Sequence, residues 1–163
     1  MFTGMFPDLT TALIGAATFA TGLLAGASLD QSVKQLPARH RIGVEAYSRY
    51  SQAADLANGV AFYATLGIAA AAFNLAAALS AAIQGLQGTQ ALAVYSGAAL
   101  AILHSLVTAR AAPANHSQRR VNDQAALTRL FDRFTRLQAA RCTLQVANFV
   151  ANLWAFVALL RAA

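Results

Sequence analysis

Four long apolar stretches that carry almost no charge constrain this chain more than any other feature. They are roughly residues 9–29, 57–83, 91–109 and 142–160. Each is long enough to supply the ~20 mostly apolar residues that an α-helix needs to cross the hydrocarbon core of a bilayer. A soluble domain carries about 25% charged residues, whereas this chain is 58% hydrophobic and 11% charged. We therefore predict an all-α integral membrane four-helix bundle, formed as a single domain by residues 1–163.

The basic residues lie almost entirely in two of the segments between these stretches. The first segment contains Lys34, Arg39, Arg41 and Arg49. The second contains Arg119, Arg120, Arg129, Arg133 and Arg136, flanked by Arg110 and Arg141. Cytoplasmic loops of membrane proteins are enriched in Lys and Arg. We therefore expect both basic segments to be cytoplasmic extensions of the bundle, and both termini to lie outside a bacterial inner membrane.

The remaining charges support this orientation and indicate the partners. Before the first stretch the chain has Asp8 and no basic residue, and the segment 84–90 has no Lys or Arg. Basic segments beside a membrane contact anionic lipid headgroups, so membrane lipids are expected partners and nucleic acid is not. Residues 25–27 resemble a signal-peptide cleavage site. However, the leader lacks a basic region and its apolar run is long, so we predict a retained membrane helix.

The connecting segments contain signals for helices and turns. Residues 43–56 fit an amphipathic interfacial helix, and the Gly-rich segment 84–90 predicts a tight turn between antiparallel helices. Pro37 is expected to interrupt a loop, and Pro113 is expected to end the third span. Residues 117–141 form an amphipathic helical pattern, which lies on the membrane surface or runs without a break into the fourth span.

Polar residues inside the apolar stretches are the candidates for a site, because each is costly in hydrocarbon unless it has a partner or a function. With the predicted topology, polar side chains from all four helices gather in the cytoplasmic half of the bundle. We predict these ligand-binding residues: Tyr63, Asn58, Gln145, Asn148, Asn152 and Trp154. The alternative is that the amides form hydrogen bonds between helices, and that Trp154 is an interfacial anchor.

The three histidines lie on the same predicted side. His104 falls within the third stretch, whereas His40 and His116 fall in the basic segments. Their spacing does not match a metal site and no carboxylate lies within a span, so neither a metal nor another cofactor is expected. His104 is either a neutral imidazole bonded to a neighbouring helix or a proton acceptor in a pocket. The single Cys142 excludes an internal disulfide and a cysteine-based metal site.

One segment resembles a known family. The chain reads Pro113-Ala-Asn115-His116-Ser-Gln-Arg-Arg120-Val-Asn122, and then Arg141 precedes the last span. This layout, with Leu36-Pro37 after a Gly/Ala-rich first span, resembles the anthrone-oxygenase-like family of small four-span membrane proteins. The resemblance implies a cofactor-independent oxygenase that deprotonates a lipophilic phenolic, anthrone-like or quinone-like molecule and oxidises it with O2. On that implication the catalytic residues are His104 or His116 as base, with Asn115, Arg141 and Asn148 holding an oxyanion.

Two further functions remain open from the sequence. One is a non-catalytic scaffold or subunit that packs against another membrane protein or a second copy, a role suited to Gly22 and Gly26. The other is a lipid or small-molecule binding module without turnover. Residues 119–123 are also similar to small glutathione-using membrane enzymes, although the accompanying acidic residues are missing. If His104, Tyr63 and Asn148 face one cavity, the enzyme and binding functions are favoured.

Overall fold

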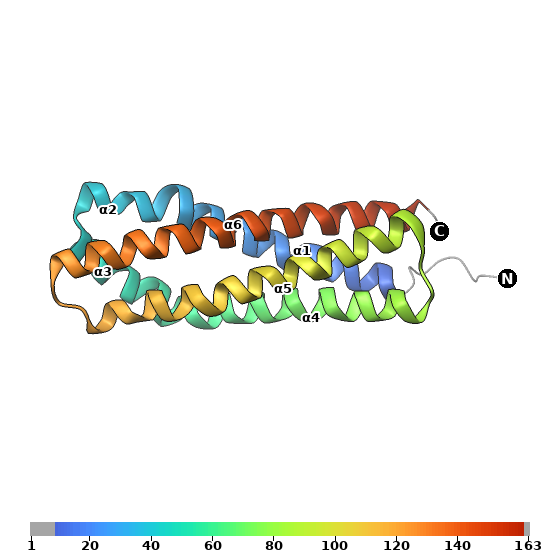
Figure 1. Ribbon diagram of the computed structural model, residues 1–163, viewed down its shortest axis with the longest axis horizontal. Coiled ribbons are helices and arrows are strands. Elements are labelled where there is room, and N and C mark those ends of the chain that lie inside the picture. Colours follow the sequence, from blue (N-terminus) through green and yellow to red (C-terminus); the bar gives the residue numbers. More distant parts are fainter. Residues whose placement is uncertain (1–8, 162–163) are drawn as a thin grey trace.

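The computed structural model describes residues 9–161, which form helices joined by short turns, with no strand among them (Figure 1). The all-α prediction is confirmed. Asp8, one of the charges that predict the orientation in the membrane, lies outside the described residues. The elements are α1 (Leu9–Asp30), η1 (Gln31–Gln35), α2 (Leu36–Ile42), α3 (Val44–Ala53), η2 (Ala54–Asn58), α4 (Gly59–Ile83), α5 (Gly88–His116), η3 (Ser117–Arg120) and α6 (Gln124–Leu160). Here η1 and η2 are π-helical turns and η3 is a 3-10 turn.

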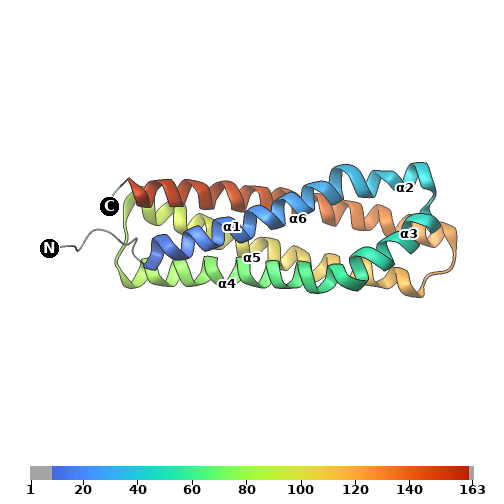
Figure 2. The ribbon, with the colours of Figure 1, turned by 180° about the vertical axis from the view of Figure 1, so that it is seen from behind.

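These elements join into four long helical rods that lie side by side. The rods are Leu9–Ile42, Val44–Ile83, Gly88–Arg120 and Gln124–Leu160, and each is long and apolar enough to cross a membrane. At 1.5 Å per residue they are roughly 50–60 Å long, whereas a hydrocarbon core is about 30 Å thick. Each rod is therefore longer than the hydrocarbon core. One end of the bundle is apolar, and the other end carries the two basic segments and is polar. The start of α1, the α4–α5 turn and the end of α6 share the apolar end (Figures 1 and 2).

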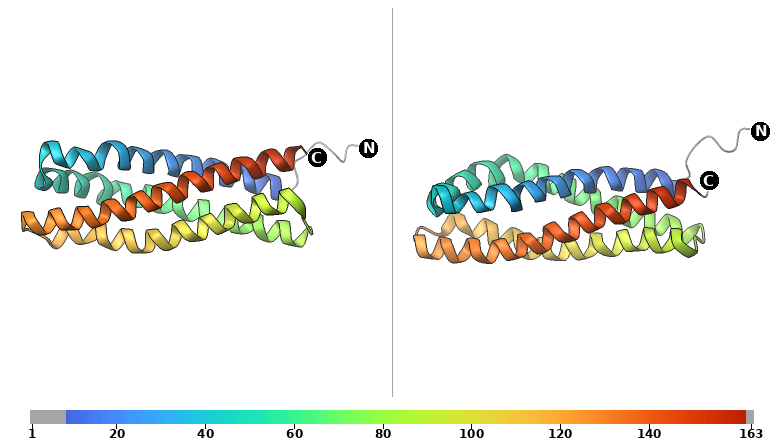
Figure 3. Two further views of the ribbon diagram at one scale, coloured as in Figure 1. Left: turned by 45° about the horizontal axis from the view of Figure 1, so that its top comes forward. Right: turned by 90° about the horizontal axis from the view of Figure 1, so that it is seen from above.

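The four long helices pack as a ring in which α1 contacts α4 and α6, and α5 contacts α4 and α6 (Figure 3). At the apolar end the core consists of small and branched side chains, which include Ile14, Ala77, Val94 and Ala155. Gly22 packs against Phe149, because a Cβ at this glycine would lie 3.0 Å from the ring. A Cβ at Gly26 would meet nothing within 4 Å.

The basic segments are helices rather than loops, which corrects two expectations. Pro37 occupies the first turn of α2, where a helix lacks an amide partner and tolerates proline. Pro113 lies inside α5, which continues to His116. Beside it Ala111 is fully buried in a cluster with Leu127 and Phe131. We attribute the continuation to this packing, which opposes the cost of the lost hydrogen bond.

The other connections are partly as expected. Residues 124–160 form one unbroken helix, so the continuous alternative is confirmed and a separate surface helix is wrong. The α4–α5 turn is shorter than predicted, since α4 ends at Ile83 and α5 begins at Gly88. The helix predicted over 43–56 forms α3, but Tyr47 is buried edge-on against Phe131 of α6 and is not presented outward.

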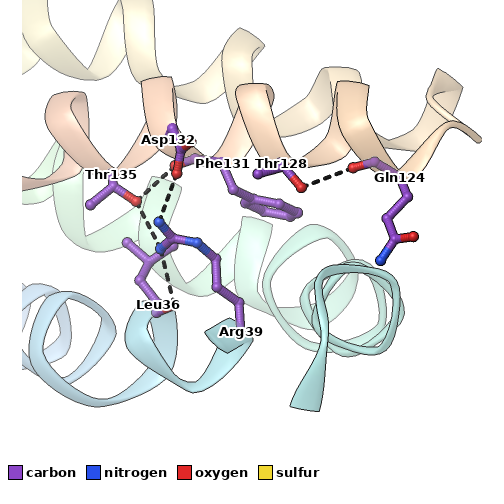
Figure 4. Close-up of polar contacts among 7 residues, drawn as sticks. All are labelled: Leu36, Arg39, Gln124, Thr128, Phe131, Asp132 and Thr135. Atoms are coloured by element: carbon purple, nitrogen blue, oxygen red, sulfur yellow. Dashed lines mark hydrogen bonds and ion pairs between the residues drawn. The ribbon is translucent and has the colours of Figure 1, made fainter. Parts of the chain in front are cut away.

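Polar contacts join the rods at the polar end of the bundle. Arg39 of α2 donates to the Leu36 carbonyl at 3.1 Å, to Thr135 Oγ1 at 3.0 Å and to Asp132 Oδ1 at 3.0 Å (Figure 4). Phe131, in the same view, packs in the apolar cluster below. The polar end is thus a second packed region, built on α2, α3, α5 and α6.

Candidate functional site

A cavity of about 200 Å³ lies between the apolar and polar ends of the bundle. Its walls come from α1, η1, η2, α4, α5 and α6. The apolar lining side chains include Leu24, Leu56, Val60, Ala64 and Phe134. The polar lining side chains are Ser28, Gln31, Asp55, Tyr63, His104, Thr108, Asn115, His116, Arg141 and Gln145. The cavity thus combines apolar walls with a few convergent polar groups, the usual composition of a small-molecule site.

Six of the ten residues proposed from the sequence line this cavity. They are His104, His116, Asn115, Arg141, Tyr63 and Gln145. The other four lie elsewhere: Asn58 and Trp154 are exposed, whereas Asn148 and Asn152 are fully buried deeper in the bundle. The structure therefore brings His104 and Tyr63 to one cavity but does not bring Asn148 to it.

His104 is the most deeply buried titratable group on the cavity. It lies on α5 and is 3% exposed. Among the described residues neither Nδ1 nor Nε2 of its ring has a hydrogen-bond partner. Buried polar atoms in folded proteins nearly always have a partner, so this imidazole is available to a molecule in the cavity as a donor, an acceptor or a base.

A chain of hydrogen bonds forms the polar wall of the cavity. Arg141 Nη2 donates to Gln31 Oε1 at 3.0 Å, and Gln31 Nε2 lies 3.4 Å from Asp55 Oδ2. Ser51 donates to the same Asp55 oxygen at 2.9 Å. Gln31 thus links a half-buried cation to a buried carboxylate. Arg141 Nε has no partner within the described part of the chain, so one charged donor remains for a ligand.

Two π-helical turns place this wall. Gln31 lies in η1 and Asp55 in η2. A π-turn adds a residue to the helix, so it rotates the following side chains relative to a regular α-helix, and such turns are frequent at functional sites. The rotation occurs where α1 passes into α2 and where α3 passes into α4. Each π-turn delivers a polar side chain to the cavity.

Further hydrogen bonds extend the wall toward the polar end. Gln118 Nε2 donates to Ser51 Oγ at 3.2 Å and to Asn115 Oδ1 at 2.8 Å. Ser48 donates to Gln118 Oε1 at 3.0 Å. These bonds position Asn115, one of the lining residues, and they join α3 to the end of α5.

Burial shifts the pKa values of the charged groups on the wall, which lie outside the stretches 57–83 and 142–160. Loss of solvent raises the pKa of Asp55, although the hydrogen bonds from Ser51 and Gln31 and the charge of Arg141 oppose this. Burial lowers the pKa of Arg141, opposed by Tyr63 and Asp55. Both shifts have the same cause, since a low-dielectric site disfavours each charged form.

Two of the buried amides below the cavity, Asn74 and Asn152, lie where helices pack closely. A Cβ at Gly97 of α5 would clash with Asn152 Oδ1 and lie 2.9 Å from Asn74 Oδ1. Asn74 Nδ2 donates to the Ala70 carbonyl at 2.7 Å, and Asn152 Nδ2 donates to Thr21 Oγ1 at 3.3 Å. The three helices α4, α5 and α6 therefore approach closely at Gly97, where a side chain would not fit.

The wall also contains Asp55, Gln31 and the Ser51–Gln118 pair, which the sequence pattern did not predict. Asp55 lies just before the second apolar stretch, so it does not stand out as an intramembrane carboxylate. A usable signal was present, because Ser51 and Asp55 are four residues apart and share one helix face. Gln31 had no such signal, because a π-turn sets its direction.

The described residues contain no group of three or more His, Cys, Asp or Glu side chains arranged to hold a metal ion. Compared with protein-family models, curated proteins and solved structures, the chain gives no match.

Proposed function

We propose that this is an integral membrane protein whose apolar end crosses the bacterial inner membrane and whose basic end projects into the cytoplasm. Large apolar side chains on the outside of the apolar end support this placement, with Phe19 71%, Ile68 71% and Ile83 79% exposed. Such surfaces are stable in lipid and unfavourable in water. In this orientation the cavity lies at the cytoplasmic boundary of the membrane.

Within that framework we propose an enzyme that oxidises a lipophilic phenolic or anthrone-like molecule with O2 and without a cofactor. The observation that carries the proposal is the unpartnered, buried imidazole of His104 in a cavity that also holds Arg141. A base and a cation around one cavity suit removal of a proton and stabilisation of the resulting anion.

The reaction balances with O2 as the only oxidant. For a phenol such as 1-naphthol, His104 takes the hydroxyl proton and Arg141 stabilises the oxyanion. The ring carbon para to that oxygen then reacts with O2 to give a peroxide anion, and the imidazolium of His104 returns its proton to form the hydroperoxide. Loss of the hydrogen from this carbon and cleavage of the O–O bond leave a second carbonyl and release one water. The substrate becomes a quinone.

The size of the cavity limits the part of the substrate that it encloses. A cavity of 150 Å³ accommodates benzene, and this one is about 200 Å³. We expect one or two fused rings to be enclosed. A three-ring anthrone would extend past the lining residues.

The test is turnover by the detergent-purified protein with anthrone and with 1-naphthol, measured as quinone absorbance and O2 consumption. The matched variants are His104→Gln and His40→Gln, because His40 is exposed and does not line the cavity. We expect His104→Gln to lower the rate by about 10²-fold or more, as for loss of a general base, and His40→Gln to leave it unchanged.

Native mass spectrometry separates the alternatives. An aromatic or quinone that co-purifies near one per chain, without O2 consumption, would replace the enzyme by a binding module. A protein that carries only bulk phospholipid and turns over neither substrate would overturn the proposal in favour of a scaffold.

A further inference from the structure

The exposure of the lining residues differs sharply around the cavity. Residues contributed by α1, η1, η2 and α6 are mostly buried, with Ser28 5%, Gln31 4%, Asp55 7%, Phe134 2% and Gln145 3% exposed. On the opposite side, Val60 and Ala64 of α4 and Ala112 and His116 of α5 are all exposed. The cavity therefore has a closed back and an open front between α4 and α5.

The first half of α4 is only partly covered along this front, although Leu66 and Ala69 pack against the cluster of Leu24 and Ala70. All of the buried residues of α4 lie between Ala70 and Ala81, and none lies between Gly59 and Ala69. Gly67 lines the cavity, and a Cβ there would meet nothing within 4 Å. Val60, Ala64 and Gly67 follow a spacing of four and three residues, so they form one helix face toward the opening.

Both ends of the cavity are closed. Toward the polar end lies the buried cluster that includes Ala111, Phe131 and Phe134. Arg119 also donates to the Leu56 carbonyl and ties η3 to η2 there. Toward the apolar end Leu24 packs with Ala20 and Ala70. A molecule therefore reaches the cavity neither along the bundle axis from the cytoplasm nor from the opposite end.

The open front straddles the membrane boundary, because Val60 and Ala64 lie inside the stretch 57–83 whereas Ala112 and His116 lie past the end of the stretch 91–109. Val60 and Ala64 lie three and seven residues past the start of the second apolar stretch, which is roughly 5–10 Å inside the boundary at 1.5 Å per residue. Large apolar side chains on the same turns point outward, with Phe62 54% and Leu106 60% exposed. The edge of the opening is therefore apolar and lipid-facing at Val60 and Ala64, and it is polar at His116.

We infer that the ligand is a membrane-dissolved amphiphile that enters sideways between α4 and α5. Its ring head of one or two rings lies against Arg141, Gln31 and Asp55. Its apolar chain passes out between Val60 and Ala64 of α4 and Thr108 of α5 into the acyl chains. The back wall offers a charged donor beside a carboxylate, so the head carries an acceptor such as a carbonyl or oxyanion next to a hydroxyl. This inference rests on the proposed function, because it requires that the cavity bind such a molecule.

The test uses photolabelling in liposomes of phosphatidylcholine and phosphatidylglycerol. The probe is a 2-hydroxy-1,4-naphthoquinone with a decyl chain that carries a diazirine at the end nearest the ring, and the competitor is the same naphthoquinone without the chain. After illumination the labelled residues are mapped by mass spectrometry. We expect label on residues 59–69 of α4 and 105–112 of α5, and we expect excess competitor to remove it.

Matched variants test the opening itself. Ala64→Trp places a large ring in the opening, whereas Ala61→Trp lies on the same helix, exposed and away from the cavity. We expect Ala64→Trp to reduce competitor-sensitive labelling by about tenfold or more and Ala61→Trp to leave it unchanged. Circular dichroism of both variants establishes that the helices remain folded.

The outcomes separate the two proposals. If the wild-type protein shows no competitor-sensitive labelling, the proposed ligand class is wrong and the inference falls with it. If labelling is competitor-sensitive but maps to α1, α6 or the polar end, or if Ala64→Trp labels as the wild type does, the lateral route alone is overturned.

Discussion

The two halves of α4 both carry small residues, but they lie in opposite environments. From Ala70 onward, one face of the helix is buried against α1 and α5, and Asn74 lies close to Gly97. From Gly59 to Ala69 no residue is buried, and Gly67 faces open space. The comparison teaches that small residues serve two purposes in this bundle. In one half they allow close helix contact, and in the other they leave room for a ligand.

The largest expected effect on stability comes from the closely packed half of α4, from Ala70 onward, where Asn74 lies close to Gly97 of α5. Gly97→Ala introduces a methyl group where Asn152 Oδ1 and Asn74 Oδ1 already lie, so we expect a loss of about 1–3 kcal/mol in stability from overpacking. Thermal unfolding in detergent, followed by circular dichroism, measures it. Gly26→Ala is the control, because a Cβ at Gly26 meets nothing within 4 Å. If Gly97→Ala and Gly26→Ala are equally stable, the contact at Gly97 is not close, and the two halves of α4 do not differ in packing.

The open half predicts the reverse pattern. Gly67→Leu places its side chain in the cavity, so we expect ligand affinity to fall by about tenfold or more while the unfolding temperature stays near that of the wild type. The probe is the chain-bearing naphthoquinone described above, and Gly26→Leu is the matched control. If Gly67→Leu unfolds, residues 59–69 of α4 are closely packed and the open half does not exist. If it binds the probe normally, the cavity is not the ligand-binding site.

A smaller effect is expected where the polar ends of the rods are joined. Arg39→Ala removes the bonds to Leu36, Thr135 and Asp132. We expect a stability loss of about 1 kcal/mol or less, since the Asp132 partner is solvent-exposed. The exposed Arg41, changed to Ala, is the comparison. If the loss exceeds that of Gly97→Ala, the main anchor of the bundle lies at the polar end rather than at the tight half of α4.

The smallest effect concerns Asp55 and depends on pH. Because burial raises the pKa of this carboxyl group, its contribution to stability is fully present below the unfolded pKa of about 4. That contribution is lost as the pH rises through the folded pKa. Asp55→Asn should therefore be slightly more stable than the wild type at pH 7, and the difference should shrink toward pH 4. Unfolding curves at several pH values measure it, and an advantage that grows on acidification would contradict the buried carboxylate.

Much of the candidate site could be predicted because its residues sit inside strong local patterns. His104 and Gln145 were recognisable as polar side chains within apolar stretches, and Arg141 as the charge before one. Asn148 and Asn152 share the helix face of Gln145, yet both are fully buried and neither lines the cavity. Periodicity defines a helix face, but it does not determine how far along the helix a cavity extends.

The sequence by itself determined the four apolar helices, their order and the concentration of charge at one end. These follow from hydropathy and local periodicity, which depend on neighbours in the chain. Only the tertiary structure decided that the basic segments continue as helices past Pro37 and Pro113, that two π-turns direct Gln31 and Asp55 inward, and that one half of α4 is open. Each of these depends on the balance of packing between helices distant in sequence, which no local pattern contains.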